Sequence, residues 1–431
     1  MSTKVLVISN NAFSNQKNNG KTLLSFFKDV AKKNLQQIFF SGEAPDCDCA
    51  RGYFRISDSD VVKSIIKPGK KAGSIINYET GIKATPSSNQ KAKATTLLRE
   101  YESIRLLREV AWALSPKNEV ELERWVVDFS PDVVFFCAGD SGFAYDVYEK
   151  VCKFLPGSKK CIYITDDYIL PRPTISLFWW IRRQIVLNKM KRSVTASDIF
   201  VTISEKMRSE YKKIFGVDSI VAFNMPESIR VEGFVKSERE DLVLVYAGGL
   251  HFNRWKTLKR LGEALDIFNR ENDRQVTLKI YSHQDLSRKV QEALSTANSS
   301  EFAGSLDNDG VRCALNDADI LVHVESFSKR NVYSTRLSVS TKISEYLMAG
   351  KPVLAIGPSE LASMEFLSTR GFCINSNKDL KNKLKEFLLS DRSVELGGEE
   401  QELDFLANER EFKQLVLTSG SLQSKRRNDQ E

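Results

Sequence analysis

Short apolar runs alternate with amphipathic stretches along almost the whole chain. This alternation is typical of a parallel sheet whose strands are joined by crossover helices. In the first half, apolar runs predict buried strands at Val5–Ser9, Ile38–Phe40, Val133–Cys137, Cys161–Thr165, Ile199–Ile203 and Ile220–Phe223. Amphipathic stretches predict crossover helices at Thr22–Lys33, Phe143–Phe154 and Ser204–Phe215. The pattern therefore predicts an α/β fold.

The same pattern begins again in the second half. It predicts strands at Leu242–Ala247, Val276–Tyr281, Ile320–Val324 and Val353–Ile356. After the first of these strands comes a predicted helix whose apolar face carries Leu258, Leu261, Leu265 and Phe268. Another helix, from about Lys342 to Ala349, ends at Gly350, because glycine readily adopts the left-handed conformation found at helix ends. A second α/β domain also agrees with a length of 431 residues.

The segments around these patterns set the domain boundaries. We expect an N-terminal domain over residues 1–225, a linker over 226–240, a C-terminal domain over 241–400, a final helix over 401–418 and a disordered tail over 419–431. The polar stretch Pro45–Gln90, rich in Gly, Ser and Lys, predicts a mobile excursion. A long helical stretch over Lys91–Phe129, broken at Pro116, follows it.

Composition describes a soluble globular protein, since 42% of the residues are apolar and 28% are charged. The net charge of +7 favours an anionic partner only weakly. No apolar run approaches the roughly 18–20 residues that span a bilayer, and no signal peptide is visible. Seven scattered cysteines indicate free thiols in a reducing compartment, and three histidines without a Cys/His pairing argue against zinc. We therefore expect a cytoplasmic protein.

The segment Ser340–Pro358 carries the clearest chemical signal. Glu345 lies near the N-terminus of its predicted helix, where a carboxylate can accept two hydroxyls, for instance from a ribose. Backbone N–H groups at a helix N-terminus can meet a phosphate. Lys342 could reach the same phosphate, or it could simply begin the helix as a solvated residue.

The loop after the strand Leu242–Ala247 has the composition of a phosphate-binding loop. Gly248 and Gly249 permit positive φ and a close approach of the backbone to a ligand. Arg254 and Lys256 could neutralise a diphosphate, with Arg suited to a bidentate contact. The alternative is an ordinary tight turn followed by a solvated basic helix start. The Glu345 helix in the same domain favours the phosphate interpretation.

These features resemble the donor site of glycosyltransferases of the GT-B fold, in particular the bacterial family-4 or group-1 enzymes of surface polysaccharide assembly. The resemblance implies two Rossmann-like domains facing across a cleft. It also implies a nucleotide-diphosphate sugar as donor substrate, with no cofactor or metal required. In this resemblance Glu345 corresponds to the ribose-binding glutamate.

The donor loop departs from the pattern of that family at two points. Lys256 matches the lysine of the family's loop, but Gly249 or Leu250 stands where an arginine is usual, and Arg254 could substitute for it. Glu325, at the end of the strand Ile320–Val324, is a donor-site candidate that lies much farther from the second glutamate than the family's motif places it. Retention or inversion of the sugar's configuration therefore stays open.

Two loops of the N-terminal domain are predicted to face the acceptor. Asn19 and Gly20 end a loop that resembles the acceptor-facing loop of GT-B enzymes. This loop is not a P-loop, because Asn15 stands where the first glycine is needed. Asp140 and Ser141, which follow a buried strand, are further candidates for contact with the acceptor.

Paired aspartates occur twice, and we interpret the two pairs differently. Asp166 and Asp167 end a buried strand and are candidate catalytic carboxylates, although aspartates at this place also commonly cap a following helix. Asp317 and Asp319 superficially match a metal-binding D-x-D motif. They precede a strand instead of coming after one, so we interpret them as capping residues.

The stretch 174–192 combines aromatic, apolar and basic residues, including Trp179 and Trp180. As a helix it would place Leu177, Ile181 and Ile185 on one face. The first interpretation is a crossover helix packed on the core. The second is an interfacial helix that contacts an anionic membrane surface and presents the enzyme to a lipid-linked acceptor.

We therefore predict a hexosyltransferase-like enzyme that moves a sugar from a nucleotide-diphosphate sugar to a saccharide or lipid-linked saccharide. The expected setting is capsule, O-antigen or exopolysaccharide synthesis, in the cytoplasm or peripherally on the inner face of the membrane. A GT-B nucleotide-sugar 2-epimerase and a non-catalytic GT-B scaffold subunit are the alternatives. Nucleic-acid binding is not expected, because the basic residues are spread along the chain.

Overall fold

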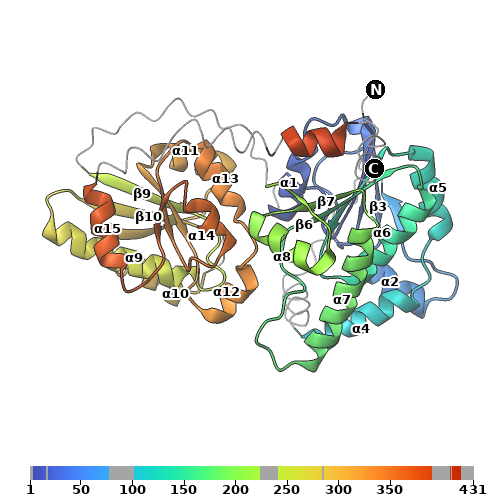
Figure 1. The fold of residues 1–431 in the computed structure, drawn as a ribbon, viewed down its shortest axis with the longest axis horizontal. Coiled ribbons are helices and arrows are strands. Elements are labelled where there is room, and N and C mark those ends of the chain that lie inside the picture. The colour runs from blue at the N-terminus through green and yellow to red at the C-terminus, as the bar shows by residue number, and fades with distance from the viewer. Residues whose placement is uncertain are drawn as a thin grey trace, which may run out of the picture. The chain divides into compact units, whose positions relative to one another are not determined.

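The computed structural model describes residues 3–15, 18–76, 101–223, 241–283, 286–390, 408 and 410–418. The chain divides into two compact units (Figure 1). Unit 1 contains Met1–Asn224 and Glu409–Glu431, and unit 2 contains Met225–Asn408. Each unit is built on its own largely parallel sheet, as the alternating pattern predicts.

The sheet of unit 1 has the strand order β4-β3-β2-β1-β5-β6-β7-β8. Every neighbouring pair is parallel except β3 and β4. Burial of the central strands on both faces explains their almost continuous apolar sequences. The strands are β1 Val5–Ser9, β2 Leu35–Phe39, β3 Gly52–Arg55, β4 Ser74–Ile76, β5 Val133–Ala138, β6 Lys159–Ile164, β7 Ile199–Thr202 and β8 Ile220–Val221.

Helices connect and cover these strands, and several begin or end where local chemistry requires it. Ser57 starts α2 with a reciprocal capping box to Asp60, and Ser204 caps α8 by accepting from the Met207 N–H. Gly216 ends α8 with φ +70°. The helices are α1 Asn18–Ser25, α2 Asp58–Ile66, α4 Glu102–Leu114, α5 Glu119–Phe129, α6 Gly142–Phe154, α7 Leu177–Thr195 and α8 Glu205–Phe215.

Two predictions for unit 1 are wrong. The stretch expected as a mobile excursion, Pro45–Gln90, contains β3, α2 and β4, because Tyr53, Phe54 and Val61 are buried in the core. Its residues 77–90 lie outside the described part of the chain. The first helix is α1, which begins and ends earlier than the predicted Thr22–Lys33.

Unit 2 has the parallel strand order β11-β10-β9-β12-β13-β14. The apolar face predicted for the first helix is confirmed, since Leu258, Leu261, Leu265 and Phe268 of α9 are all buried. The strands are β9 Leu242–Ala247, β10 Val276–Tyr281, β11 Ser300–Gly304, β12 Ile320–Val324, β13 Val353–Ile356 and β14 Phe372–Ile374. The helices are α9 Arg254–Glu271, α10 Arg288–Leu294, α11 Asn308–Asp317, α12 Lys329–Thr335, α13 Thr341–Met348, α14 Ala362–Leu367 and α15 Leu380–Leu389.

A C-terminal segment, residues 410–418, belongs to unit 1. Phe412 is fully buried, with its ring 4.9 Å from that of Phe26 and 6.0 Å from that of Phe135. Lys413 pairs with Asp29 at 2.5 Å, and a turn of π-helix covers Lys413–Leu417. The predicted linker 226–240, most of the predicted helix 401–418 before Arg410 and the predicted tail 419–431 lie outside the described residues.

The cysteines differ from expectation at one point. Cys47 and Cys49 form a disulfide, whereas the scattered spacing predicted free thiols throughout. Cys137, Cys152, Cys161, Cys313 and Cys373 carry free thiols. Burial raises the pKa of the Cys152 thiol to about 11, which disfavours the reactive thiolate form at neutral pH.

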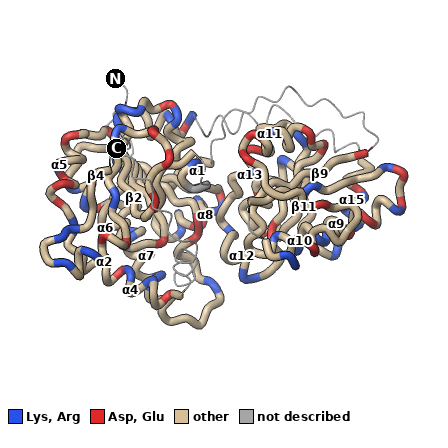
Figure 2. The backbone as a smooth tube through the Cα atoms, turned by 180° about the vertical axis from the view of Figure 1, so that it is seen from behind, with Lys and Arg blue, Asp and Glu red and all other residues tan. Residues whose placement is uncertain are grey.

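Charged residues of both signs are distributed over both units (Figure 2). None of the helices in the described ranges is long and apolar enough to cross a membrane.

Candidate functional site

Each sheet reverses its strand order at one point, and ligands of doubly wound folds bind outside the carboxyl ends of the strands there. In unit 2 this point lies between β9 and β12, which are direct neighbours. The loop from Gly248 to Asn253 leaves β9, and Glu325 leaves β12. The sequence-predicted Gly248, Gly249, Arg254 and Glu325 therefore all lie at one edge of this sheet.

Gly248 and Gly249 leave space for neighbouring side chains and do not supply unusual backbone angles. Neither has a positive φ, in contrast to the prediction. A Cβ at Gly249 would lie 2.5 Å from the ring of His251, and one at Gly248 would lie 3.0 Å from the Tyr246 hydroxyl. The positive φ values fall instead on Phe252 (58°) and Asn253 (63°), just before α9. Two consecutive non-glycine residues in this region are costly unless their surroundings hold them.

Arg254 and Glu325 form a buried ion pair across the two loops. Arg254 Nη2 lies 2.9 Å from Glu325 Oε1 and 3.0 Å from Oε2, and Nε lies 3.1 Å from Oε2. The Glu325 side chain is 3% exposed and that of Arg254 is 12% exposed. Burial acts to raise the pKa of Glu325, but Arg254 and His323 outweigh it and hold that pKa below its ordinary value.

Two histidines flank this pair. His323, buried in β12, places Nε2 3.2 Å from Glu325 Oε1. His251 lies exposed in the β9–α9 loop, with Nε2 3.4 Å from Arg254 Nη1. Partial burial of the ring lowers the pKa of His251, and the positive charge of Arg254 lowers it further. No local pattern in the sequence indicates this grouping, because His251 and Arg254 lie about 70 positions from His323 and Glu325.

Three further side chains fix the loops, and sequence reasoning missed all of them. The Thr257 hydroxyl donates to the Glu325 carbonyl at 2.8 Å. The Asn331 amide donates to the Phe252 carbonyl at 2.5 Å and so holds the left-handed turn. The Tyr346 hydroxyl accepts from the Ala247 N–H at 3.0 Å and lies 3.3 Å from the Ala247 carbonyl. Tyr346 thereby connects α13 to the end of β9.

The helix that carries Glu345 is α13, close to the predicted bounds. It starts after Ser340, which makes no side-chain cap hydrogen bond, and it ends at Gly350 with φ +63°. Lys342 Nζ lies 2.7 Å from Glu345 Oε2, so the two predicted residues form a partly buried pair. A ribose would have to share or replace this contact.

Lys256 lies in the first turn of α9, exposed, with its ammonium 5.6 Å from the centroid of the Trp255 ring. Its charge therefore stands at the N-terminus of α9, where helix dipole and basic side chain both favour an anion.

In unit 1 the corresponding point lies between β1 and β5. Their loops touch closely, since a Cβ at Gly139 would lie 2.3 Å from Asn10 Nδ2. Gly20 lies in α1, where a Cβ would approach the Ala12 carbonyl oxygen to 2.4 Å. The predicted Asn19 also lies in α1, and its side chain is outside the description.

Asp140 and Ser141 are engaged by arginines of other elements. Asp140 pairs with Arg105 of α4 and with Arg182 of α7, whose Nη1 lies 3.3 Å from Oδ2. Arg182 is 4% exposed and also binds Glu102 through Nε at 2.6 Å. Ser141 accepts from Arg108 at 3.2 Å. These contacts hold α4 and α7 on the β5–α6 loop.

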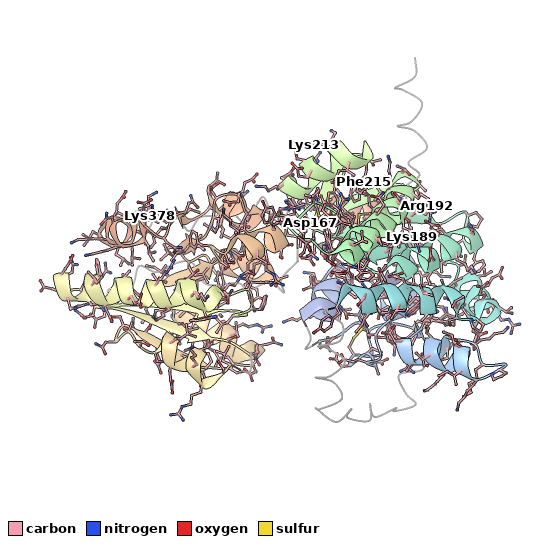
Figure 3. All side chains as sticks on the ribbon, turned by 90° about the horizontal axis from the view of Figure 1, so that it is seen from below. Asp167, Lys189, Arg192, Lys213, Phe215 and Lys378 are labelled. Atoms are coloured by element: carbon pink, nitrogen blue, oxygen red, sulfur yellow. A yellow bond between two sulfur atoms is a disulfide. The ribbon has the colours of Figure 1, made fainter. Side chains whose placement is uncertain are left out.

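Asp166 and Asp167 take different roles after β6. Asp167 Oδ1 accepts from the backbone N–H groups of Ile169 at 3.2 Å and Leu170 at 2.9 Å and so closes a local turn; no helix begins there, because α7 starts only at Leu177. Asp166 is exposed and lies within 3.3 Å of the hydroxyls of Thr165 and Tyr168. Figure 3 labels Asp167. Within the described ranges, no group of three or more His, Cys, Asp or Glu side chains could hold a metal ion.

No protein-family model matches this chain, and no curated protein matches it. Solved structures match it over nearly their whole length. A structure titled trehalose-6-phosphate from E. coli, bound with UDP-2-fluoro glucose, has a TM-score of 0.60 at 9% identity and covers 96% of this chain and 98% of its own.

Two other solved structures match this chain over a similar length. A trehalose 6-phosphate synthase from Burkholderia multivorans gives a TM-score of 0.54 at 11% identity, with 96% of each chain covered. A glycosyltransferase from Rickettsia africae gives 0.54 at 12% identity, covering 96% of this chain and 99% of its own. At these identities the likeness concerns the fold, which is the GT-B fold with two Rossmann-like domains.

Proposed function

We propose that this chain is a glycosyltransferase that uses a nucleotide-diphosphate sugar. The observation that carries the proposal is the meeting of Arg254, Glu325 and the Gly248–Asn253 loop at the β9/β12 switch point of a GT-B protein. A diphosphate would lie against the start of α9, with Arg254 and Lys256 offsetting the charge that develops on the leaving group. Glu345 would bind the ribose.

The structure changes the role proposed for Glu325. Its carboxylate is buried and occupied by Arg254, so we assign it to orienting the guanidinium and not to the sugar. The acceptor would be a saccharide or lipid-linked saccharide, as in capsule, O-antigen or exopolysaccharide synthesis. Asp166 is the better candidate for activating the acceptor's hydroxyl, because the Asp167 carboxylate is engaged in a local turn. No metal is required in this proposal, since basic side chains take the place of a divalent cation.

The direct test is a titration with UDP, GDP and CMP, with and without Mg²⁺. We expect saturable binding of one nucleotide, and a loss of about tenfold or more in affinity in Lys256→Ala and in Glu345→Ala, because a hydrogen bond to a charged group contributes about 1.5–3 kcal/mol. Lys259→Ala is the matched control, since Lys259 lies on the same helix and pairs with Glu263.

Turnover then separates the alternatives. Hydrolysis or transfer of the sugar from the bound nucleotide supports the transferase. Binding without any turnover supports the scaffold subunit, and binding of none of the nucleotides contradicts a donor site in unit 2.

We further propose that the N-terminal end of α7 contacts a membrane surface. Ile175, Leu177, Phe178, Trp180 and Ile181 are exposed there, whereas Trp179 and Val186 face the core. The buried face fits the crossover-helix interpretation, and the exposed apolar residues support the proposal of membrane contact. Lys189 and Arg192, labelled in Figure 3, pair with Asp146 and Glu149 of α6, so the apolar end and not the basic end would supply most of the binding.

Sedimentation with vesicles of phosphatidylethanolamine and phosphatidylglycerol tests this contact. Replacing Leu177 and Phe178 with Ser should release the protein into the supernatant. Leu389→Ser is the control, because Leu389 is similarly exposed (60%, against 67% for Leu177) but lies in unit 2. Equal sedimentation of both variants would contradict the proposal.

A further inference from the structure

His251 occupies an unusual place in the β9–α9 loop. Its ring lies directly on Gly249, where any larger residue would displace it, and edge-on to Phe252 with 4.9 Å between the ring centroids. Nε2 points at Arg254 Nη1, 3.4 Å away. The ring therefore stands beside the guanidinium that the proposed function assigns to the diphosphate.

This geometry favours a neutral ring in the free protein. Arg254 has only N–H donors, so the contact is favourable only when Nε2 carries a lone pair. If the ring were protonated, two positive charges would lie in contact, and both nitrogen atoms would be N–H donors without an acceptor between them. The groups acting on His251 are Arg254 of α9 and Glu325 after β12, and Glu325 is already neutralised by Arg254. Burial and Arg254 both lower the pKa of His251, in agreement with a neutral ring at pH 7.

An anion between the two side chains reverses this preference. A phosphate oxygen beside Nε2 and Nη1 would accept from both groups, and its charge would favour the imidazolium. The charges of Arg254 and Glu325 sum to zero before binding, so Lys256 contributes the net positive charge among these three residues. A protonated His251 would offset part of the remaining negative charge of the diphosphate.

We infer that His251 is a phosphate ligand that takes up a proton when a nucleoside diphosphate binds. The inference rests on the proposed donor site and deepens it. It predicts that affinity falls as pH rises. Between the pKa of His251 in the free protein and its higher pKa in the complex, linkage sets a limit of about tenfold in Kd per pH unit for one proton.

Calorimetric titration with UDP and with GDP, near pH 7 in buffers of different ionisation enthalpy, counts the protons taken up. With the nucleotide that binds, we expect the wild type to take up more protons than His251→Gln, by up to one proton. The variant retains the ligand's own titration and so corrects for it. His283→Gln is the matched control, because His283 is an exposed histidine of unit 2 that contacts Ser305. Uridine or guanosine, which lack phosphate, should cause no uptake.

Proton NMR of the wild type gives a second measurement that does not depend on the folding of a variant. The chain has only three histidines, so the ring signals are few, and His251→Gln assigns one of them. The pKa of His251 should rise on saturation with the nucleotide. Equal proton uptake in the wild type and His251→Gln, or an unchanged His251 pKa, would overturn the inference and leave the donor site intact. If neither UDP nor GDP binds, the inference on His251 and the proposed donor site are both overturned.

Discussion

The two switch points both place arginine against carboxylate just beyond a central strand, but they do so in different ways. In unit 2 a single arginine, Arg254, meets a single buried carboxylate, Glu325. In unit 1 Arg182 bridges Glu102 and Asp140, and these two acids also bind Arg172 and Arg105. The first arrangement is a pair, and the second is a network over α4, the β5–α6 loop, α7 and the segment before α7.

The difference indicates that the arginine network of unit 1 mainly stabilises the fold, whereas the ion pair of unit 2 also serves binding. The network of unit 1 fixes α4, α7 and the β5–α6 loop to one another, so its removal should chiefly lower stability. The pair in unit 2 holds one side chain beside an exposed loop with strained backbone angles at Phe252 and Asn253. Its removal should lower both stability and binding, and the two effects should be separable.

The largest effect is expected for Arg182→Ala in unit 1. Removing this 4% exposed guanidinium leaves two carboxylates without a shared partner, and breaking a buried charge pair costs about 3–5 kcal/mol. Chemical denaturation followed by fluorescence reports mainly on unit 1, which contains four of the five tryptophans. Lys191→Ala, on the exposed face of the same helix, is the control. A loss similar to that of the control would show that the network is not structural.

A double-mutant cycle on Arg254→Met and Glu325→Leu should have the next largest effect. Each single variant should lose about 3 kcal/mol of unfolding free energy, because it leaves one buried charge unpaired. The double variant should recover most of this loss. Nucleotide affinity should stay reduced in all three, since none retains the guanidinium in place.

Recovered affinity in the double variant would assign Arg254 a structural role only. Trp255 is the single tryptophan of unit 2 and reports on its unfolding.

The change in the unfolding free energy of unit 2 with pH should be smaller than the change caused by removing Arg254 or Glu325. The pKa of Glu325 is lowered in the folded protein, so its contribution to stability is fully present above its unfolded value of about 4.3. That contribution is lost as pH falls through the lower folded pKa. Acid unfolding followed at Trp255 should therefore be less steep in Glu325→Gln than in the wild type. Identical slopes would mean that the pKa of Glu325 is the same in the folded and unfolded states.

The smallest effect is expected for Tyr346→Phe, which removes the hydroxyl between α13 and the end of β9. The expected loss is about 1 kcal/mol, the usual net contribution of a hydrogen bond. Hydrogen exchange at the Ala247 amide should accelerate as well. Tyr333→Phe, whose ring is exposed over Arg336, serves as control and should leave the exchange at Ala247 unchanged.

The sequence predicted those parts of the fold in which local pattern and burial agree. The strand β1, the buried face of α9 and the helix α13 all result from apolar runs or periodicity. The region of β3 and α2 was missed, because its overall polarity masked a few buried aromatic and apolar residues such as Tyr53 and Phe54. Composition averaged over many residues conceals such short elements.

The site was predictable as a set of candidates but not as a set of contacts. Arg254 and Glu325 are 71 positions apart, and they meet only because β9 and β12 are neighbours in the sheet. The position of Asp140 after a strand is visible in the sequence and favours an acceptor role, whereas its partners Arg105 and Arg182 are not visible there. Pairing across elements depends on strand order, which no local pattern contains.

The return of residues 410–418 to unit 1 has a consequence for how the protein is made. Phe412 fills the core beside Phe26 and Phe135, so the first unit to leave the ribosome lacks a piece that is translated after all of unit 2. At a translation rate of about 5–20 residues per second, the synthesis of unit 2 takes on the order of tens of seconds. During this time unit 1 lacks Phe412 in its core, while unit 2 can fold. Nascent unit 1 would therefore be the stage at which a chaperone is most needed.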